Sequence, residues 1–347
     1  MSAANDFGTA YGSARVVVLG AAGFIGRWVA RALSRRAARL HLVVRDRDAA
    51  VPVFAEYGVR GDVVQLDLRA SGVLAHLIEA VRPCIVFNLA GYGIDRRQRE
   101  ERSAFALNAG VLDELSEAVA QHRDPTWSGC DIVHAGSMLE YGPIGGDLSE
   151  DSTPRPTTLY GQSKLAGTQA LERWCLRCGL KAVTARLFTV YGPGEHTGRL
   201  LPALLETAHT GRPLRLSHGT QRRDFTYVED VADGLLRLGV ARSARGEVVN
   251  LATGRLTPVR SFVEIAARLL GIPPDHLQFG AIATPTEEIE HTGVCLARLQ
   301  RLTAWIPPTS IPTGIDCALA FARKQRDHHN TKVAQSRPNG VWGRGSH

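Results

Sequence analysis

The chain has 347 residues, of which 44% are hydrophobic and 22% are charged. This composition is typical of an ordinary globular protein and excludes disordered, collagen-like and fibrous chains. At roughly 150 residues per domain, the length predicts two domains, or one domain that carries an extra lobe. No stretch comes near the roughly 18 apolar residues of a membrane span, and the first residues lack the apolar run of a secretory signal. We therefore expect a cytoplasmic protein without a membrane partner.

The formal net charge is +7, which suits either a nucleic acid or an anionic small ligand. The densest basic run, 96–102, contains glutamates and is typical of a solvated helix entry, so we expect no nucleic-acid partner. The six cysteines are too sparse for a disulfide scaffold. Cys175 and Cys178 form a C-x-x-C, but no second pair completes a metal site. We predict reduced thiols and no metal.

Short apolar runs alternate with longer helical patterns through the first part of the chain, which is typical of a parallel sheet. The expected strands are 15–19, 41–45, 62–66, 84–89, 130–134 and 181–188. The expected helices are 24–36, 71–81, 101–121 and 160–178. Because crossovers of this kind are right-handed, the sequence predicts an α/β fold with a doubly wound parallel sheet, the Rossmann fold.

The alternation stops after Tyr191, where prolines and glycines precede mixed helix and strand fragments. We therefore predict a dinucleotide-binding domain over 15–191 and a smaller mixed lobe over 192–325 that mainly binds substrate. The ends, 1–14 and 326–347, lack periodicity and are rich in polar residues and glycine. We predict that both ends are disordered.

The run VVVLGAAGFIGRW places Gly20, Gly23 and Gly26 directly between the first expected strand and the first expected helix. Gly20 permits a tight turn, Gly23 lets backbone amides approach a pyrophosphate, and Gly26 lets the helix pack on the strand. The sequence therefore predicts nucleotide binding, with Phe24 and Ile25 among the cofactor contacts. The G-x-x-G-x-x-G spacing resembles that of the short-chain dehydrogenase/reductase superfamily.

The tip of the second expected strand should meet the adenosine ribose. Arg45 occupies this tip, and its guanidinium can pair with a 2′-phosphate, which predicts NADP, used as NADPH. Asp46 follows at once and can reach a ribose hydroxyl instead, which leaves NAD as the alternative.

Tyr160 and Lys164 lie four residues apart at the start of an expected helix, and Ser137 follows the fifth expected strand. Residues at this spacing share one helix face, so the ammonium can sit near both the phenol and a nicotinamide ribose. A positive neighbour and a cationic nicotinamide should lower the pKa of the phenol from its ordinary value near 10. We predict that Tyr160 exchanges a proton with a substrate oxygen that Ser137 also binds.

With these motifs, the sequence resembles the extended short-chain dehydrogenases/reductases of the nucleotide-sugar epimerase/dehydratase type over residues 16–323. Further matching segments include NLAG at 88–91, GSMLEYG at 136–142, RLFTVYGPG at 186–194, RRDFTYVEDVADG at 222–234 and NLATG at 250–254. The resemblance implies cofactor contacts from Asp67, Leu68, Leu89, Ala90, Gly91, Asn108 and Leu187, with the first two beside the adenine. It implies substrate contacts from Tyr92, Ser137, Met138, Thr189 and Arg223, with Arg223 on the diphosphate. It also implies a homodimer.

Two departures from the family pattern reduce the number of reactions that the resemblance allows. Sugar-nucleotide dehydratases of this type carry an Asp-Glu pair after the catalytic Ser or Thr, whereas this chain has Met138 and Leu139, which cannot transfer protons. Thr189 stands where many members have Asn. We therefore place first an NADPH-dependent ketoreductase acting on a nucleotide-linked 4-keto-6-deoxy sugar. The alternative is an NAD-dependent nucleotide-sugar 4-epimerase, and a non-catalytic dinucleotide-sensing protein is disfavoured because it has no need of the Ser, Tyr and Lys set.

Overall fold

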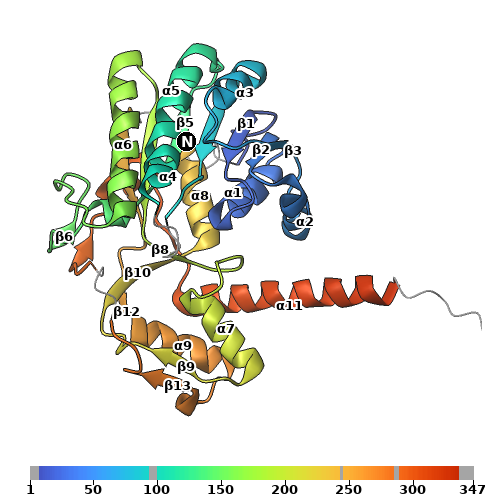
Figure 1. Cartoon of the computed structure of the whole chain (residues 1–347), viewed down its shortest axis with the longest axis vertical. Coiled ribbons are helices and arrows are strands. Elements are labelled where there is room, and N and C mark those ends of the chain that lie inside the picture. Colours follow the sequence, from blue (N-terminus) through green and yellow to red (C-terminus); the bar gives the residue numbers. More distant parts are fainter. Residues whose placement is uncertain (1–7, 94–99, 243–244, 285–288, 336–347) are drawn as a thin grey trace, which may run out of the picture.

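The computed structural model describes residues 8–93, 100–242, 245–284 and 289–335, with side chains described up to residue 325. A seven-stranded parallel sheet occupies the upper part of the molecule in Figure 1, in the order β11-β7-β5-β4-β1-β2-β3. Its strands are β1 (Arg15–Leu19), β2 (Arg39–Val44), β3 (Asp62–Gln65), β4 (Ile85–Asn88), β5 (Ile132–Ser137), β7 (Ala182–Leu187) and β11 (Glu247–Leu251). The strand order reverses between β1 and β4, which confirms the predicted doubly wound fold.

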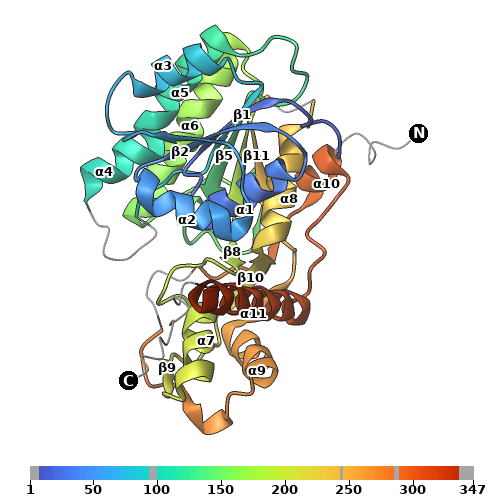
Figure 2. The ribbon, with the colours of Figure 1, turned by 90° about the vertical axis from the view of Figure 1, so that its right-hand side faces the viewer.

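Helices cover both faces of this sheet (Figure 2). On one face lie α1 (Phe24–Ser34) and α8 (Val228–Gly239), and on the other lie α3 (Val73–Val81), α5 (Val111–His122) and α6 (Leu159–Cys178). Strand β1 illustrates why the large sheet is apolar on both of its faces. Val16 and Val18 pack into the cluster under α1, whereas Val17 and Leu19 pack into the opposite cluster. Side chains alternate along a strand, so a strand buried on both faces must be apolar throughout.

The C-terminal lobe lies below the sheet in Figure 1 and contains small sheets and helices. A three-stranded sheet joins β8 (Thr189–Tyr191), β10 (Arg222–Tyr227) and β12 (Leu256–Pro258). The remaining elements here are β9 (Leu214–Leu216), β13 (Leu277–Phe279), α7 (Leu200–Thr210), α9 (Val259–Leu270) and α11 (Ile311–Gln335). Aromatic rings form its core, where Phe225 stacks on Phe262 at a centroid distance of 4.2 Å. The predicted mixed lobe is therefore present.

The segment assigned to the lobe also returns to the large sheet. Strand β11 pairs in parallel with β7, and α8 packs against α1, although both elements lie after residue 191. Helix α10 (Ala297–Thr303) packs beside them, since Arg298 donates from Nη1 to the carbonyl oxygen of Val248. The regular alternation used to predict the first domain ends before these elements, so it could not assign them to the sheet.

The local pattern missed one helix and misjudged another. Helix α2 (Arg47–Tyr57) contains Pro52, a residue that usually interrupts a helical pattern. The helix expected over 101–121 is divided into α4 (Glu101–Phe105), a π-helical turn η1 (Ala106–Gly110) and α5. Residues 94–99, which hold part of the basic run 96–102, lie outside the described residues. The short strands β6 (Asp147–Leu148) and β14 (Gly293–Val294) and the 3-10 helices η2 (Met138–Glu140) and η3 (Pro274–His276) complete the described elements.

Both ends of the chain contain structure where the sequence predicts disorder. Tyr11 is fully buried, and its hydroxyl donates to the Leu236 carbonyl oxygen at 2.6 Å, so the segment before β1 is packed against α8. Helix α11 continues to Gln335, beyond the predicted boundary at residue 325. Residues 1–7 and 336–347 lie outside the described residues.

All six cysteines are free thiols, with Cys175 buried and Cys178 exposed. Among the described residues, no cluster of His, Cys, Asp and Glu could hold a metal ion. Within the same part of the chain, no helix combines the length and apolar character needed to cross a membrane.

Candidate active site

The predicted site residues gather at the carboxyl edge of the large sheet. Gly20 follows β1, Leu89 follows β4, and Ser137 and Leu187 end β5 and β7, where they face each other in register. The carboxyl ends of parallel strands meet at one edge, and the reversal of strand order between β1 and β4 opens a crevice there. The fold therefore places the cofactor and substrate residues of the sheet at one edge.

Glycines let the turn after β1 pack closely against the neighbouring backbone. Gly20 has a φ of +74°, and a Cβ there would lie 2.8 Å from the backbone nitrogen of Ala90. A Cβ on Gly26 would collide with the carbonyl oxygen of Gly20, so this glycine lets α1 pack on β1. Gly23 is exposed at the N-terminus of α1, with Phe24 and Ile25 half-buried in the first turn. The exposed amides of a helix N-terminus suit a pyrophosphate, so the residues present fit NAD or NADP.

Arg45 and Asp46, the two residues predicted to meet the adenosine ribose, have different environments in the structure. The carboxylate of Asp46 accepts a hydrogen bond from the Ala49 backbone nitrogen at 3.0 Å and so caps α2. Arg45 is exposed at the tip of β2. Asp46 therefore has a structural role as the cap of α2, whereas Arg45 is exposed to solvent.

Asp67, which the resemblance places beside the adenine with Leu68, is held by Arg69. The Arg69 guanidinium donates from Nη2 to Asp67 Oδ2 at 2.6 Å and from Nε to Oδ1 at 3.0 Å. The hydrogen bonds from Arg69 and, to a smaller degree, the charge of Arg45 lower the pKa of Asp67 to about 2. Asp67 is therefore an anion with arginines around it.

Asn108 fastens the loop after β4 to α6. Its amide nitrogen donates to the Tyr92 carbonyl oxygen at 2.8 Å and to Ser163 Oγ at 2.9 Å, and its oxygen accepts from the Tyr92 backbone nitrogen at 3.0 Å. Asn108 lies in the π-helical turn η1, a distortion that often marks functional positions. A Cβ on Gly91 would lie 3.3 Å from Lys164 Nζ. These contacts place 89–92 against the helix that carries Tyr160 and Lys164.

Ser137, Tyr160 and Lys164 come together from β5 and the start of α6. The side chain of Thr158 accepts from the Gly161 backbone nitrogen at 3.0 Å, and this cap fixes where α6 begins. Lys164 is 3% exposed, and its Nζ donates to the Ala135 carbonyl oxygen at 3.0 Å and lies 6.0 Å from the centroid of the Tyr160 ring. The Ser137 side chain is a hydrogen-bond partner of the Tyr160 phenol.

The charges around this trio differ from the expectation for Tyr160. Burial lowers the pKa of Lys164 to about 8, although the nearby carboxylate of Glu140 raises it. Burial raises the pKa of Tyr160, and Glu140 raises it further, while Arg199 and Ser137 act in the opposite direction. The predicted lowering of the phenol pKa is therefore wrong for the protein alone, because desolvation outweighs the positive neighbours. A cationic ligand at the site would act against that desolvation.

The expected substrate residues are divided between the sheet edge and the lobe. Met138 follows Ser137 and packs against the buried cluster that contains Tyr141 and Phe188. Thr189 lies on β8 and Arg223 on β10, two adjacent strands of the three-stranded sheet. Both side chains are half-buried. The structure thus places Thr189 just beyond β7 and Arg223 on the neighbouring strand of the lobe.

Two further groups near the trio were absent from the prediction. Glu195 and Arg199 form an ion pair of 3.4 Å between β8 and α7, and the Arg199 charge reaches Tyr160. Burial raises the pKa of Glu195 to about 7. Glu140 completes a capping box with Ser137, and the S-x-x-E spacing in the sequence was the available signal for it.

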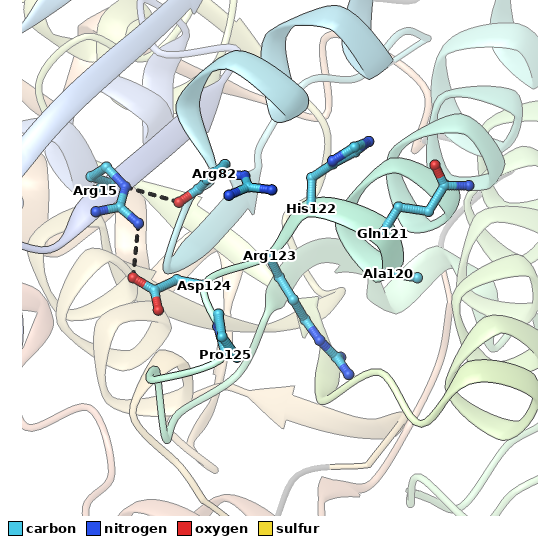
Figure 3. Close-up of a pocket in the computed structure, with 8 residues that line it drawn as sticks. All are labelled: Arg15, Arg82, Ala120, Gln121, His122, Arg123, Asp124 and Pro125. Carbon is cyan, nitrogen blue, oxygen red and sulfur yellow. Dashed lines mark hydrogen bonds and ion pairs between the residues drawn. The ribbon is translucent and has the colours of Figure 1, made fainter.

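A surface cavity of about 440 Å³ lies at the opposite, amino edge of the sheet (Figure 3). It is lined by Arg15, Arg82 and Arg123 together with the end of α5. Arg15 pairs with Asp124 at 2.8 Å and Arg123 with Asp131 at 2.6 Å, so two of its three arginines serve internal ion pairs. This cavity is separate from the candidate active site.

Comparison with known proteins identifies the family. The sequence profile described as "NAD dependent epimerase/dehydratase family" matches residues 16–252, more than half of the chain. The chain belongs to the NAD-dependent epimerase/dehydratase family. This membership confirms the resemblance drawn from the motifs, and it identifies the chain as a member of an enzyme family.

Named relatives of this family place their reactions at position 4 of a sugar. A dTDP-6-deoxy-L-talose 4-dehydrogenase (NAD(P)(+)) from Kitasatospora kifunensis is 31% identical over 300 residues, covering 82% of this chain and 89% of the relative. UDP-glucuronate 4-epimerase 3 of Arabidopsis thaliana is 27% identical over 347 residues, covering 91% and 77%. Among solved structures, MoeE5 in complex with UDP-glucuronic acid and NAD is 27% identical with a TM-score of 0.76, covering 89% and 99%.

Proposed function

We propose that this family member is an NAD-dependent 4-epimerase of a nucleotide diphosphate sugar. The observation that carries the proposal is the trio of Ser137, Tyr160 and Lys164 beside the glycine turn, in a chain similar to a UDP-glucuronate 4-epimerase and to an NAD-bound structure. These similarities favour the epimerase, the alternative of the sequence analysis, over the ketoreductase that was placed first.

Each residue of the trio has a defined role in this proposal. NAD, held by the glycine turn and Lys164, would supply a reversible acceptor for the hydride of C4. Tyr160 takes the proton of the C4 hydroxyl and later gives it back to the oxygen of the 4-keto sugar. Ser137 donates a hydrogen bond to the same oxygen and holds it next to the phenol. Lys164 binds the nicotinamide ribose, and its charge stabilises the phenolate.

A second candidate is the NADPH-dependent 4-ketoreductase, which would use the same trio in one direction. Two observations favour it: Arg45 is exposed where a 2′-phosphate would bind while Asp46 caps α2, and a 4-dehydrogenase that uses NAD(P)(+) is 31% identical. A dehydratase stays disfavoured. Glu140 does not replace the missing acid pair, because both of its oxygens accept hydrogen bonds in the protein interior.

The two candidates differ in whether the cofactor is consumed. The test incubates the purified protein with NAD and either UDP-glucuronate or a dTDP-6-deoxyhexose, and separately with NADPH and a dTDP-4-keto-6-deoxyhexose. An epimerase yields the C4 epimer by NMR with no net change in absorbance at 340 nm. A ketoreductase oxidises NADPH in proportion to the 4-keto sugar consumed. No turnover in either mixture would favour the dinucleotide-sensing protein. A homodimer and a cytoplasmic location stay predictions.

A further inference from the structure

The carboxylate of Glu140 joins the two parts of the chain that carry the proposed catalytic groups. Its Oε1 accepts a hydrogen bond from the backbone nitrogen of Ser137 at 2.8 Å. Its Oε2 accepts from Thr168 Oγ1 at 3.0 Å and from Arg186 Nε at 3.0 Å. Glu140 is 0% exposed and Arg186 is 3% exposed, so this ion pair lies inside the protein.

Thr168 belongs to the same face of α6 as the proposed catalytic residues Tyr160 and Lys164. Tyr160, Lys164 and Thr168 follow one another at intervals of four residues, which keeps them on neighbouring turns of one helix side. The bond from Thr168 to Glu140 therefore holds this helix side against the strand end that carries Ser137. The helix also approaches closely at its first turn, where a Cβ on Gly161 would collide with the Leu139 carbonyl oxygen.

Arg186 is the third hydrogen-bond partner of the Glu140 carboxylate, besides the Ser137 backbone nitrogen and Thr168. It lies on β7 in register with Gly136, and its guanidinium carbon is 4.2 Å from the centroid of the Tyr141 ring. Tyr141 in turn donates its hydroxyl proton to Asn250 Oδ1 at 2.7 Å on β11. Partners on β5, α6 and β7 thus hold the Glu140 carboxylate from three sides.

We propose that Glu140 is a positioning residue that fixes the separation of Ser137 from Tyr160 and Lys164 and places a carboxylate behind them. This inference rests on the proposed function, because it assigns Glu140 a role in the same catalytic trio. A carboxylate with both oxygens bound to three partners cannot exchange protons with a substrate. Its effect on the reaction is therefore geometric and electrostatic.

The charge of Glu140 acts on Lys164 and Tyr160 together. It raises the pKa of Lys164 against the larger effect of burial, and so helps to keep the ammonium protonated. It also raises the pKa of Tyr160. Arg199 also acts on Tyr160, and His134 on β5 interacts with Lys164. Glu172 on α6 and Arg186 on β7 interact with Glu140 itself.

Two isosteric variants separate the geometric effect from the electrostatic one. Glu140→Gln removes the charge and keeps the shape, while Thr168→Val removes one hydrogen bond and keeps every charge. The chain contains only four lysines, at positions 164, 181, 324 and 332, so lysine labelled with ¹³C at Cε gives a spectrum in which Lys164 can be assigned with Lys164→Met. The NMR titration of this signal requires no sugar substrate.

We expect Lys164 in the wild-type protein to titrate at about 8. Glu140→Gln should lower that midpoint by about half a pH unit or more, whereas Thr168→Val should leave it unchanged. Both variants should lower kcat roughly 10- to 100-fold with little change in KM, because the reacting groups lose their alignment. If Glu140→Gln does not fold, the double variant Glu140→Gln/Arg186→Met, which removes both charges of the pair, is titrated in its place with the same expected direction.

Each measurement can overturn the inference independently of the proposed reaction. An unchanged Lys164 midpoint in Glu140→Gln, or in the double variant, would refute the electrostatic role. A kcat within about twofold of wild type in both isosteric variants would refute the positioning role. If the wild-type protein turns over none of the tested sugars, the proposed function fails, while the lysine titration still decides whether Glu140 controls Lys164.

Discussion

Three polar side chains at the carboxyl edge of the large sheet are buried more deeply than the two predicted substrate residues of the C-terminal lobe. At the edge, Asn108, Glu140 and Lys164 are buried, and each side chain forms a hydrogen bond with an element other than its own. In the lobe, Thr189 on β8 and Arg223 on β10 are half-buried. The comparison indicates that Asn108, Glu140 and Lys164 are held in place by the folded protein, whereas the two residues expected to contact the substrate are partly exposed. Variants at the edge should therefore change catalysis, and variants in the lobe should change recognition.

The largest effect is expected from Tyr160→Phe, which removes the transferable proton and keeps the ring. Loss of a positioned acid or base costs roughly 100- to 10,000-fold in rate. We expect turnover to fall within that range while the Kd for NAD, measured by calorimetry, stays within about twofold. If the variant retains more than about half of the wild-type rate, Tyr160 has no part in the mechanism. The expectation that variants at the edge change catalysis would then also fail.

The variant Lys164→Met tests whether the buried lysine at the edge of the sheet lowers the free energy of unfolding. The unfolded chain keeps this lysine protonated up to about pH 10.5, but the folded protein only up to about 8. Between these values the unfolded state binds more protons, so the free energy of unfolding of the wild-type protein rises with pH. Below pH 8 the buried ammonium costs about 1–3 kcal/mol.

The cofactor-free Lys164→Met protein should therefore be inactive yet more stable than wild type by about 1–3 kcal/mol at pH 7. This advantage should vanish as the pH approaches 10. Urea denaturation followed by circular dichroism across this pH range measures both quantities. A variant that is less stable than wild type at pH 7 would show that the bond from Lys164 to the Ala135 carbonyl outweighs the cost of the charge.

Arg45→Ala tests the cofactor end of the same edge. If the guanidinium pairs with a 2′-phosphate, its loss should weaken NADPH binding roughly 10- to 100-fold and leave NADH unchanged. Asp46→Ala is the matched neighbour, and it should cost about 1 kcal/mol of stability through the lost cap of α2 with little effect on either Kd. A wild-type preference for NADH of about tenfold or more, or damage to NADH binding in Asp46→Ala, would exclude the NADPH ketoreductase.

The smallest effect is expected from Arg223→Ala in the lobe. We expect a rise of about tenfold in the KM of the sugar nucleotide with kcat and the Kd for NAD nearly unchanged, since the charge is assigned to the substrate diphosphate. Arg222→Ala is the control, because the Arg222 guanidinium is exposed and donates to the Leu256 carbonyl oxygen. Equal KM values for the two variants would show that the diphosphate binds elsewhere.

Local patterns in the sequence were sufficient to predict the first six strands of the large sheet and the motifs at the ends of those strands. Apolar runs and glycine spacing are local properties, and the residues that they indicated, from Gly20 to Lys164, lie at one edge of the sheet. Strand β11 was missed because its assignment depends on pairing with β7, which is distant in sequence. Tyr11 was missed for the same reason, since its burial depends on α8 and its own surroundings are rich in glycine.

The candidate site shows the same limit. The S-x-x-E spacing at Ser137 and Glu140 could be read directly, but the partners that fix Glu140 come from α6 and β7. The π-helical turn at Asn108 depends on a hydrogen-bond register that amphipathic spacing does not reveal. The direction of the Tyr160 pKa was misjudged because the sequence shows the charged neighbours but not the degree of desolvation.

The path of the chain after β7 limits how this protein can be recombined with its relatives. The chain enters the lobe at β8, returns to the sheet as α8 and β11, leaves again at β12, and packs beside the sheet once more as α10. A chimera with a single junction after Tyr191 would therefore import the edge strand of the sheet along with the foreign lobe. A chain truncated at that junction would expose the edge of β7, and an open, apolar strand edge favours pairing between molecules. Specificity could be exchanged only by replacing several lobe segments while keeping α8, β11 and α10 from the recipient.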